Sequence, residues 1–173
     1  DQWDEYLAKA DGDDRTAVRI RKVREIQQLG GEVMIMAVDV SDEPAMKEAA
    51  LQIHERFGPI NGIINCGFVP DGTVIDQRTR EISETVFAPK VKGTLLLHDI
   101  FGKQTPLDFF VSCSSMASIF GPIGQVAYTA AGAFQDAFAH YAHYQSAGAG
   151  HNTHIVSINW CAWAEVGALL DSV

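Results

Sequence analysis

The sequence has few cysteines, no long apolar run and a shortage of basic residues. Its three cysteines are far apart and odd in number, so they match neither paired metal-ligand spacing nor a disulfide framework. We therefore expect a reduced, cytoplasmic protein without a bound metal. No apolar run approaches the roughly 18 residues that a membrane span needs, and the acidic start is unlike a signal peptide.

The charge balance argues against a nucleic-acid partner. Lys and Arg number 13 against 22 Asp and Glu, which gives a formal net charge of −9. A face that contacts phosphates needs clustered Lys and Arg, and the one basic run, residues 19–24, alternates with apolar residues. This pattern is typical of a solvated helix face.

Segments typical of helices alternate along the chain with short apolar segments typical of strands. We expect strands at 33–38, 62–65, 107–113 and 153–159. We expect helices at 14–29, at 41–57 with Ser41 as N-cap, at 78–101 with a kink near Ala88 caused by Pro89, and at 125–146. This alternation predicts an α/β fold whose parallel sheet is covered on both faces.

Hydroxyl side chains occur where one expected strand ends and the next helix begins. Ser114 and Ser115 follow an apolar strand, and Tyr128 comes 13 residues after Ser115. An unperturbed tyrosine has a pKa of about 10, so it becomes a useful acid only near a cation, which Lys90 or Lys92 could supply. On spacing alone, an ordinary strand end and helix surface explain the same residues at least as well.

Four sequence blocks change that balance: residues 89–95 (PKVKGTL), 109–115 (FFVSCSS), 121–128 (GPIGQVAY) and 158–167 (INWCAWAEVG). In order and spacing they closely resemble the ketoreductase domain of modular polyketide synthases, a member of the short-chain dehydrogenase/reductase superfamily. The resemblance extends over nearly the whole chain, from Trp3 onward. It implies a Rossmann-like, doubly wound parallel sheet with strand order 3-2-1-4-5-6-7.

The resemblance also implies an activity and its residues. The expected reaction is NADPH-dependent reduction of a β-ketoacyl thioester to the β-hydroxyacyl thioester. The substrate would hang from the phosphopantetheine arm of an acyl carrier protein, beside the other domains of a multifunctional synthase. Tyr128 would protonate the ketone oxygen and Ser115 would hydrogen-bond it. Lys90 would lower the tyrosine pKa and help hold the cofactor ribose, whereas we expect Lys92 to be solvated.

Tyr128, Lys90 and further positions are implied to contact the cofactor. Asp39 and Val40 correspond to an adenine-contacting pair, although Asp39 could instead form a helix cap with Ser41. The loop that lies against the cofactor corresponds to Asn65, Cys66 and Gly67. The loop beside the nicotinamide corresponds to the segment with Trp160 and Trp163, which could equally be core aromatics.

The sequence departs from the family pattern at three places. Gly132 stands where the family has an Asn four positions after the Tyr, and Phe68 stands where it has a cofactor-loop Gly, unless a one-residue shift places Gly67 there. The glycine-rich fingerprint G-x-G-x-x-G is absent. Besides these three departures, the family's Leu-Asp-Asp stereochemical marker survives only as residues 69–72 (VPDG).

The missing glycine-rich fingerprint and the expected strand order indicate that the chain is only part of a domain. By the family strand order, 33–38 would be the third strand and 62–65 the fourth, with the first two strands lying between them. Residues 1–173 therefore read as a partial ketoreductase domain that lacks the first two strands and the last edge strand, and we expect the chain alone to be inactive.

The alternative is a degenerate, non-catalytic ketoreductase-like structural or docking module, which Gly132, Phe68 and the missing glycine-rich loop favour. Retention of Ser115, Tyr128 and Lys90 together favours the enzyme. In a decaying site, Gly132→Asn should raise turnover and Gly132→Ala only stability, since a glycine inside a helix costs about 1 kcal/mol relative to alanine. In a working enzyme, which we expect here, Gly132→Asn should change turnover little.

Overall fold

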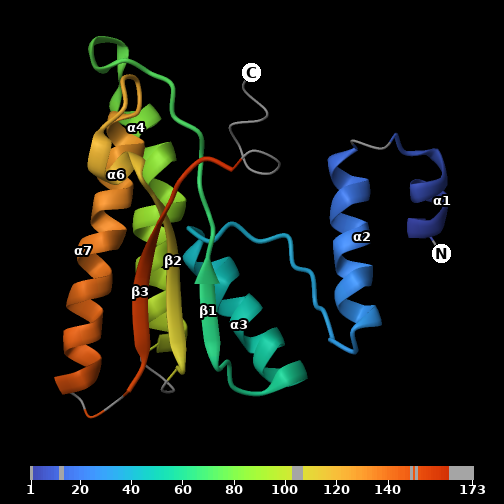
Figure 1. Ribbon diagram of the computed structural model, residues 1–173. Coiled ribbons are helices and arrows are strands. Elements are labelled where there is room, and N and C mark those ends of the chain that lie inside the picture. Colours follow the sequence, from blue (N-terminus) through green and yellow to red (C-terminus); the bar gives the residue numbers. More distant parts are fainter. Residues whose placement is uncertain (1, 12–13, 103–106, 149, 151, 164–173) are drawn as a thin grey trace. The chain divides into compact units, whose positions relative to one another are not determined.

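The structure is a computed structural model that describes residues 2–11, 14–102, 107–148, 150 and 152–163 (Figure 1). The chain divides into two compact units, Asp1–Ala37 and Val38–Val173. Each unit is described by itself below.

The first unit consists of helices α1 (Gln2–Lys9) and α2 (Arg15–Gln28). Asp14 caps α2, because its carboxylate accepts a hydrogen bond from the Ala17 N–H at 2.6 Å. The same carboxylate accepts a hydrogen bond from the Tyr6 hydroxyl at 3.1 Å, which ties the two helices together. The helix expected at 14–29 is confirmed, and within the basic run Arg19, Arg21 and Lys22 are exposed as predicted.

Residues 33–38 form no strand, so this prediction was wrong. An apolar run becomes a parallel strand only when a neighbouring strand accepts and donates its backbone hydrogen bonds. None of the described residues pairs with this segment. The apolar run favours a strand, but no strand that could pair with it is present among the described residues.

The second unit is built on three parallel strands, β1 (Gly62–Asn65), β2 (Phe109–Ser115) and β3 (His154–Trp160). They lie side by side in the order β1-β2-β3 (Figure 1). The register places Asn65 beside Ser112, and Ser115 beside Trp160. Three of the four predicted strands are therefore confirmed, within one or two residues at each end, and their carboxyl ends meet at one edge of the sheet.

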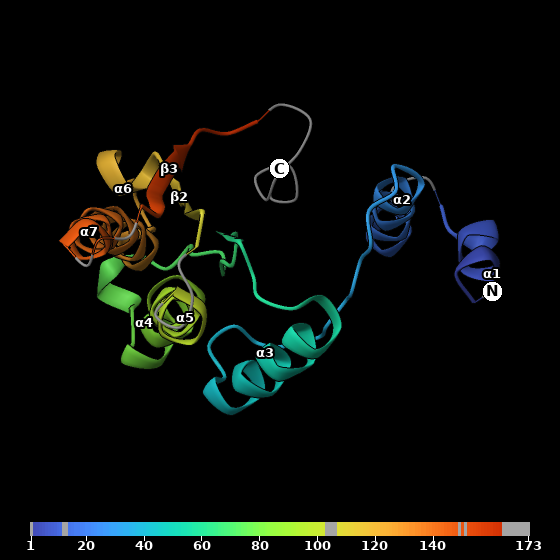
Figure 2. The same ribbon diagram turned by 90° about the horizontal axis from the view of Figure 1, so that it is seen from below.

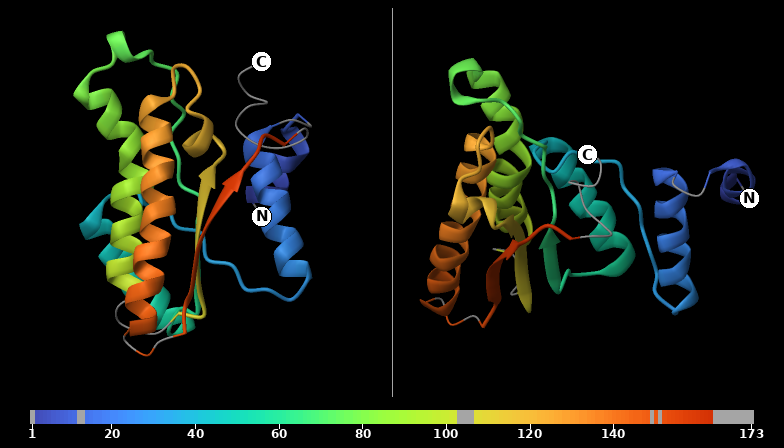
Figure 3. Two further views of the ribbon diagram at one scale, coloured as in Figure 1. Left: turned by 60° about the vertical axis from the view of Figure 1, so that its left-hand side comes forward. Right: turned by 45° about the horizontal axis from the view of Figure 1, so that its top comes forward.

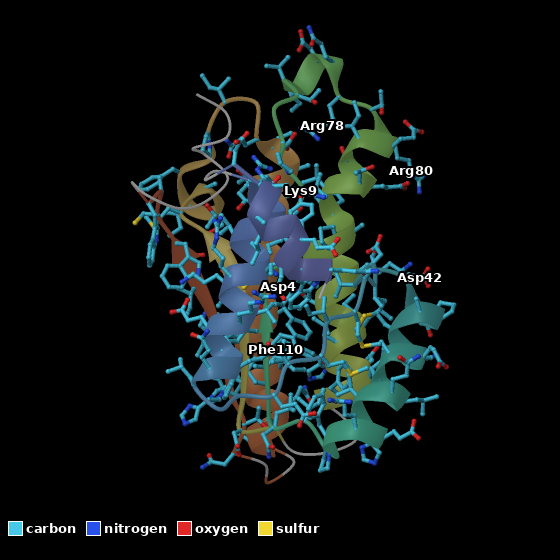
Figure 4. All side chains as sticks on the ribbon, turned by 90° about the vertical axis from the view of Figure 1, so that its right-hand side faces the viewer. Asp4, Lys9, Asp42, Arg78, Arg80 and Phe110 are labelled. Carbon is cyan, nitrogen blue, oxygen red and sulfur yellow. The ribbon has the colours of Figure 1, made fainter. Side chains whose placement is uncertain are left out.

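The helices of this unit begin with α3 (Glu43–Phe57) and end with α7 (Val126–Gly148). Between them lie η1 (Ile75–Gln77), α4 (Arg80–Phe87), η2 (Ala88–Lys92), α5 (Gly93–Leu97), η3 (His98–Gly102) and α6 (Ala117–Phe120). The N-cap of α3 is Asp42 (labelled in Figure 4), whose carboxylate accepts from the Ala45 N–H at 3.1 Å. The expectation that Ser41 caps this helix was wrong, because Ser41 donates to Asp39 instead.

The predicted interruption at Pro89 takes the form of a π-helical turn. In η2 the Gly93 N–H bonds to the carbonyl of Ala88, five residues earlier. Such turns widen a helix locally and are frequent at functional sites. Here the turn leaves Lys90 buried while Lys92 is exposed, as expected for Lys92.

The core lies between the sheet and one layer of helices. Figure 2 shows α7 and the α4–α5 segment along one face of the strands, and Figure 3 shows these helices running alongside each other. Phe110 of β2 (labelled in Figure 4) is fully buried there against Phe138 of α7. On the opposite face Ile64 is 62% exposed, and Val156 and Ile158 are exposed too.

The expectation of two covered faces is thus met on one face only within the second unit. Exposed isoleucine and valine on a parallel strand need a cover, because such strands are stable when both faces exclude water. The described residues of this unit do not supply that cover. Within the part of the chain that the structure describes, no helix is long and apolar enough to cross a membrane.

Candidate active site

A buried lysine lies at the centre of the candidate site. Lys90 is 1% exposed, and its Nζ donates to the Cys113 carbonyl oxygen at 2.6 Å and to Gln135 Oε1 at 3.0 Å. The same Nζ lies 5.2 Å from the centroid of the Tyr128 ring. Desolvation lowers the pKa of Lys90, and the negative charges that Cys113, Asp136 and Cys66 can carry oppose that shift. The structure therefore brings the predicted lysine and tyrosine together.

Tyr128 is held in the first turn of α7 by a carboxylate from a distant loop. Asp71 Oδ2 accepts the backbone N–H groups of both Ala127 and Tyr128 at 3.2 Å. Asp71 is itself paired with Arg78, whose position is marked in Figure 4. Among the described residues no group hydrogen-bonds to the Tyr128 hydroxyl, and the side chain is half-buried. The hydroxyl is thus available to a substrate oxygen.

Ser115 ends β2 at the same edge of the sheet. Its Oγ accepts the backbone N–H of Ala117 at 3.2 Å, which leaves the hydroxyl proton to donate elsewhere. The end of β2 is joined to α7 through Ser114, whose hydroxyl donates to the Gly132 carbonyl at 3.3 Å. A second link runs from the Thr129 hydroxyl to the Ala117 carbonyl at 3.1 Å. These links fix the strand end that carries Ser115 against the helix that carries Tyr128.

The loop after β1 is shaped by Asn65. Its buried amide donates to Thr94 Oγ1 at 3.0 Å and accepts the Gly67 N–H at 3.1 Å. A Cβ on Gly67 would lie 3.2 Å from the Cβ of Pro89, whereas Phe68 is 44% exposed. The close backbone approach is therefore at Gly67, which fits the one-residue shift considered for this loop.

Asp39 and Val40 have different surroundings: Asp39 bonds to Ser41, and Val40 packs against the loop after β1. Asp39 Oδ1 accepts both the N–H and the hydroxyl of Ser41 at 2.8 Å. This is a local turn and not the helix cap considered as its alternative role, because Asp42 caps α3. These hydrogen bonds lower the pKa of Asp39. Val40 packs against two glycines, because a Cβ on Gly93 would lie 2.8 Å, and one on Gly67 3.5 Å, from Val40 Cγ1. Val40 thus reaches the loop that Asn65 shapes.

Two cysteines far apart in the sequence meet at this edge of the sheet. Cys66 Sγ lies 3.1 Å from Cys113 Sγ, and both cysteines are free thiols. Desolvation and the neighbouring Cys113 thiol raise the pKa of Cys66 to about 11.

The two tryptophans predicted beside the nicotinamide contact each other. The rings of Trp160 and Trp163 meet edge to face with centroids 5.5 Å apart, and both side chains are exposed. Trp160 lies on the face of β3 that the described residues leave uncovered, so a core position and a place beside the nicotinamide both stay predictions.

Gly132 sits where no side chain fits. A Cβ there would lie 2.9 Å from Ser118 Cβ and 3.0 Å from Ser114 Oγ, both closer than ordinary packing allows. The glycine lets α7 approach α6 and the end of β2. This close packing reverses our expectation for Gly132→Ala: overpacking should outweigh the gain in helix propensity and lower stability.

Four residues that support the site were missed in the sequence, namely Asp71, Thr94, Gln135 and Asp136. A sequence signal for Gln135 was present, because it is a polar residue seven positions after Tyr128, on a helix face whose other buried residues are apolar. The signal for Asp71 was not, because its partner Tyr128 is 57 positions away.

The residues at this edge fit the reacting end of a nicotinamide cofactor. Gly67 keeps one backbone segment free of a side chain, and Lys90 supplies a buried cation beside the Tyr128 ring. Among the described residues there is no group of three His, Cys, Asp or Glu that could hold a metal ion.

Comparison with known proteins identifies the family. A model of the KR domain family matches residues 7–165. The highly reducing polyketide synthase ZEA2 of Gibberella zeae is 34% identical over 158 residues, which are 91% of this chain and 6% of that synthase. Polyketide synthase PksN of Bacillus subtilis is 31% identical over 152 residues, which are 87% of this chain and 3% of PksN.

Solved structures agree with this assignment. A ketoreductase domain from the bacillaene assembly line matches with a TM-score of 0.79 and 34% identity, over 92% of this chain and 37% of that one. A short-chain dehydrogenase from Streptomyces avermitilis, 16% identical with a TM-score of 0.72 over 81% of this chain and 52% of that one, shares the fold. The chain spans about a third of the solved ketoreductase and a small part of each synthase. It belongs to the ketoreductase domains of polyketide synthases, within the short-chain dehydrogenase/reductase superfamily.

Proposed function

We propose that this chain carries the catalytic residues of an NADPH-dependent ketoreductase in polyketide biosynthesis. Its substrate is a β-ketoacyl thioester on the phosphopantetheine arm of an acyl carrier protein, and its product is the β-hydroxyacyl thioester. It works in the cytoplasm beside the other domains of a synthase.

The observation that carries this proposal is the placement of Lys90 beside Tyr128. An ammonium group that is 1% exposed is costly to bury, and an apolar side chain of similar size would serve a purely structural module at least as well. A cation whose Nζ lies 5.2 Å from the tyrosine ring is placed to stabilise the phenolate left after proton transfer. Perturbed, buried charges of this kind gather at functional sites.

Each side chain then has a defined task. When bound, the cofactor supplies the hydride. The Tyr128 hydroxyl gives its proton to the ketone oxygen as negative charge develops there. Ser115 donates a hydrogen bond to the same oxygen, since the Ala117 N–H already occupies one of its acceptor positions. Lys90 stabilises the Tyr128 phenolate until the proton is replaced.

The remaining predicted contacts are part of the same proposal. Asn65, Cys66 and Gly67 form the loop that lies against the cofactor, with Asn65 fixing its shape from within. Val40 lines that loop, and Asp39 turns the chain beside it. Trp160 and Trp163 lie beside the nicotinamide.

The test uses the complete ketoreductase domain, because this chain lacks the glycine-rich fingerprint and spans 37% of a solved ketoreductase. Fluorescence enhancement of NADPH reports binding, and turnover of a β-ketoacyl thioester mimic reports reduction, with NADH as the comparison cofactor. We expect Lys90→Met to abolish turnover and Lys92→Met, its exposed neighbour, to retain it. A wild-type domain that neither binds NADPH nor reduces the thioester would establish the non-catalytic module instead.

A further inference from the structure

Gln135 is a buried amide that touches the candidate catalytic lysine. It lies on α7 one turn after Gly132 and is 0% exposed. Its Oε1 accepts a hydrogen bond from Lys90 Nζ at 3.0 Å, and its Nε2 donates to Thr94 Oγ1 at 3.2 Å. A polar side chain this deep in an apolar helix face is expensive unless both ends of its amide are satisfied, as they are here.

The hydrogen-bond pattern determines which way the amide points. The Thr94 hydroxyl donates its one hydrogen bond to the Lys90 backbone carbonyl at 2.5 Å. Its oxygen can therefore only accept a hydrogen bond from Gln135. The NH2 end of Gln135 must therefore face Thr94, and its oxygen must face Lys90. Asn65 Nδ2 also donates to Thr94 Oγ1, at 3.0 Å, which anchors the hydroxyl from the side of β1.

This arrangement leaves Lys90 with one free direction. Its ammonium group has three protons, of which the Cys113 carbonyl and Gln135 Oε1 accept two. The centroid of the Tyr128 ring lies 5.2 Å from the same Nζ. The other titratable groups around Lys90 are the Cys113 and Cys66 thiols and the Asp136 carboxylate. Two fixed acceptors thus hold the ammonium where it serves the tyrosine.

We propose that Gln135 is a positioning residue for catalysis, which holds Lys90 at Tyr128 from one helix turn beyond Gly132. The inference rests on the proposed reductase activity. It also explains how the site can do without a side chain at position 132, where a Cβ would lie 2.9 Å from Ser118 Cβ. The family's Asn amide has no room at position 132, and the side-chain amide of Gln135 contacts Lys90 in its place.

The experiment compares Gln135→Leu, Gln135→Glu and Thr94→Val in the complete domain, with Thr79→Ala as the control. Thr79 caps α4 by accepting the Ile82 N–H at 3.3 Å and does not bond to Lys90, Gln135 or Asp136, so its loss should lower stability without loosening the lysine. The readouts are kcat, KM, the thermal midpoint and the NMR titration of Lys90 in 13C-lysine-labelled protein without cofactor. The Lys90 resonance is assigned by its loss in Lys90→Met.

We expect Gln135→Leu to lower kcat at least roughly tenfold with little change in KM, since a misplaced catalytic group slows chemistry more than binding. Losing an acceptor for the charged amine lowers the Lys90 pKa further. Gln135→Glu keeps an acceptor oxygen, so it restores most of kcat and raises the Lys90 pKa instead. Thr94→Val removes the partner of the Gln135 NH2 group, so the amide can turn. It should lower kcat and the Lys90 pKa as Gln135→Leu does, and it tests the inference if Gln135→Leu does not fold.

A Gln135→Leu domain with kcat within about twofold of wild type and an unmoved Lys90 titration would overturn the inference. So would a loss confined to the thermal midpoint, as expected for Thr79→Ala, because such a loss means that Gln135 has a purely structural role. If the wild-type domain reduces no thioester, the proposed function fails, and the Lys90 titration alone then decides whether Gln135 holds the lysine.

Discussion

Asp71 Oδ2 accepts a hydrogen bond from the backbone N–H of Tyr128 at 3.2 Å, although the two residues are 57 positions apart. The acceptor sits at the N-terminal turn of α7, where backbone N–H groups lack helical partners and a negative charge is favourable. Arg78 pairs with the same carboxylate, and both side chains are buried. The loop after β1 therefore sets the position of the proposed proton donor.

Replacing that carboxylate should destabilise the domain. Asp71→Asn leaves the Arg78 charge buried without its partner, and two Arg78 nitrogens, Nε and Nη1, already lack hydrogen bonds among the described residues. Breaking such a pair from one side costs about 3–5 kcal/mol, which urea unfolding at pH 7 would measure. Asp76→Asn, an exposed aspartate five positions on, is the control. A variant as stable as this control would contradict the account.

The same carboxylate predicts a pH dependence. Desolvation acts to raise the pKa of Asp71, but Arg78 and the N–H groups of Tyr128 and Thr73 outweigh it and lower the pKa below its usual value. A depressed carboxylate pKa means that its stabilisation is complete above about pH 4, the unfolded value, and is lost as the pH falls through the folded value. The stability difference between wild type and Asp71→Asn should therefore shrink below pH 4. A constant difference down to pH 2 would contradict it.

Two glycines of one helix should respond oppositely to alanine. A Cβ on Gly132 meets Ser118 and Ser114 within 3.0 Å, whereas one on Gly148 meets nothing within 4 Å. We expect Gly132→Ala to lower the free energy of unfolding by about 1–3 kcal/mol. Gly148→Ala should raise it by up to about 1 kcal/mol. Chemical denaturation of both variants measures the pair, and equal stabilisation by both would show that α7 does not pack closely at position 132.

The Cys66 thiol should be unreactive at neutral pH despite its exposed position. Its pKa of about 11 keeps it protonated, and only the thiolate is alkylated. The rate of iodoacetamide labelling of Cys66, followed by peptide mass spectrometry, should rise about tenfold per pH unit from 7 to 10. Cys113→Ser removes the neighbouring thiol that contributes to the shift, so it should speed labelling at pH 8. A rate that levels off near pH 9 would contradict the raised pKa.

The two serines at the end of β2 should separate catalysis from stability. Ser115→Ala removes a donor to the developing oxyanion and should lower kcat on the order of one hundredfold. Ser114→Ala removes a hydroxyl that donates to the Gly132 carbonyl, so it should lower stability and leave kcat nearly unchanged. Steady-state kinetics on the complete domain compare them, and the reverse ranking would assign the wrong serine to the site.

The sequence predicted the elements that depend on local patterns. The strand at Gly62–Asn65 and the helix that begins near Gln125 follow from apolar periodicity and turn residues in the adjacent sequence. The segment 33–38 failed because a parallel strand depends on its neighbours, and no described residue pairs with it.

In the candidate site, too, the sequence indicated some residues and missed others. Lys90 and Tyr128 could be proposed from a family resemblance, and the structure places them together. The supports of that pair, Asp71 and Gln135, depend on contacts between segments far apart in the chain, which no local pattern records. Position 132 misled for the same reason, since its need for glycine is imposed by Ser118 of another helix.

The most direct test of the proposed catalysis is the turnover of Tyr128→Phe in the complete domain. Because no described residue hydrogen-bonds to the Tyr128 hydroxyl, its removal should leave the thermal midpoint unchanged. Reduction of the β-ketoacyl thioester should fall to background, since the proton donor is gone. A folded Tyr128→Phe domain that keeps more than about a tenth of wild-type turnover would show that another group protonates the ketone.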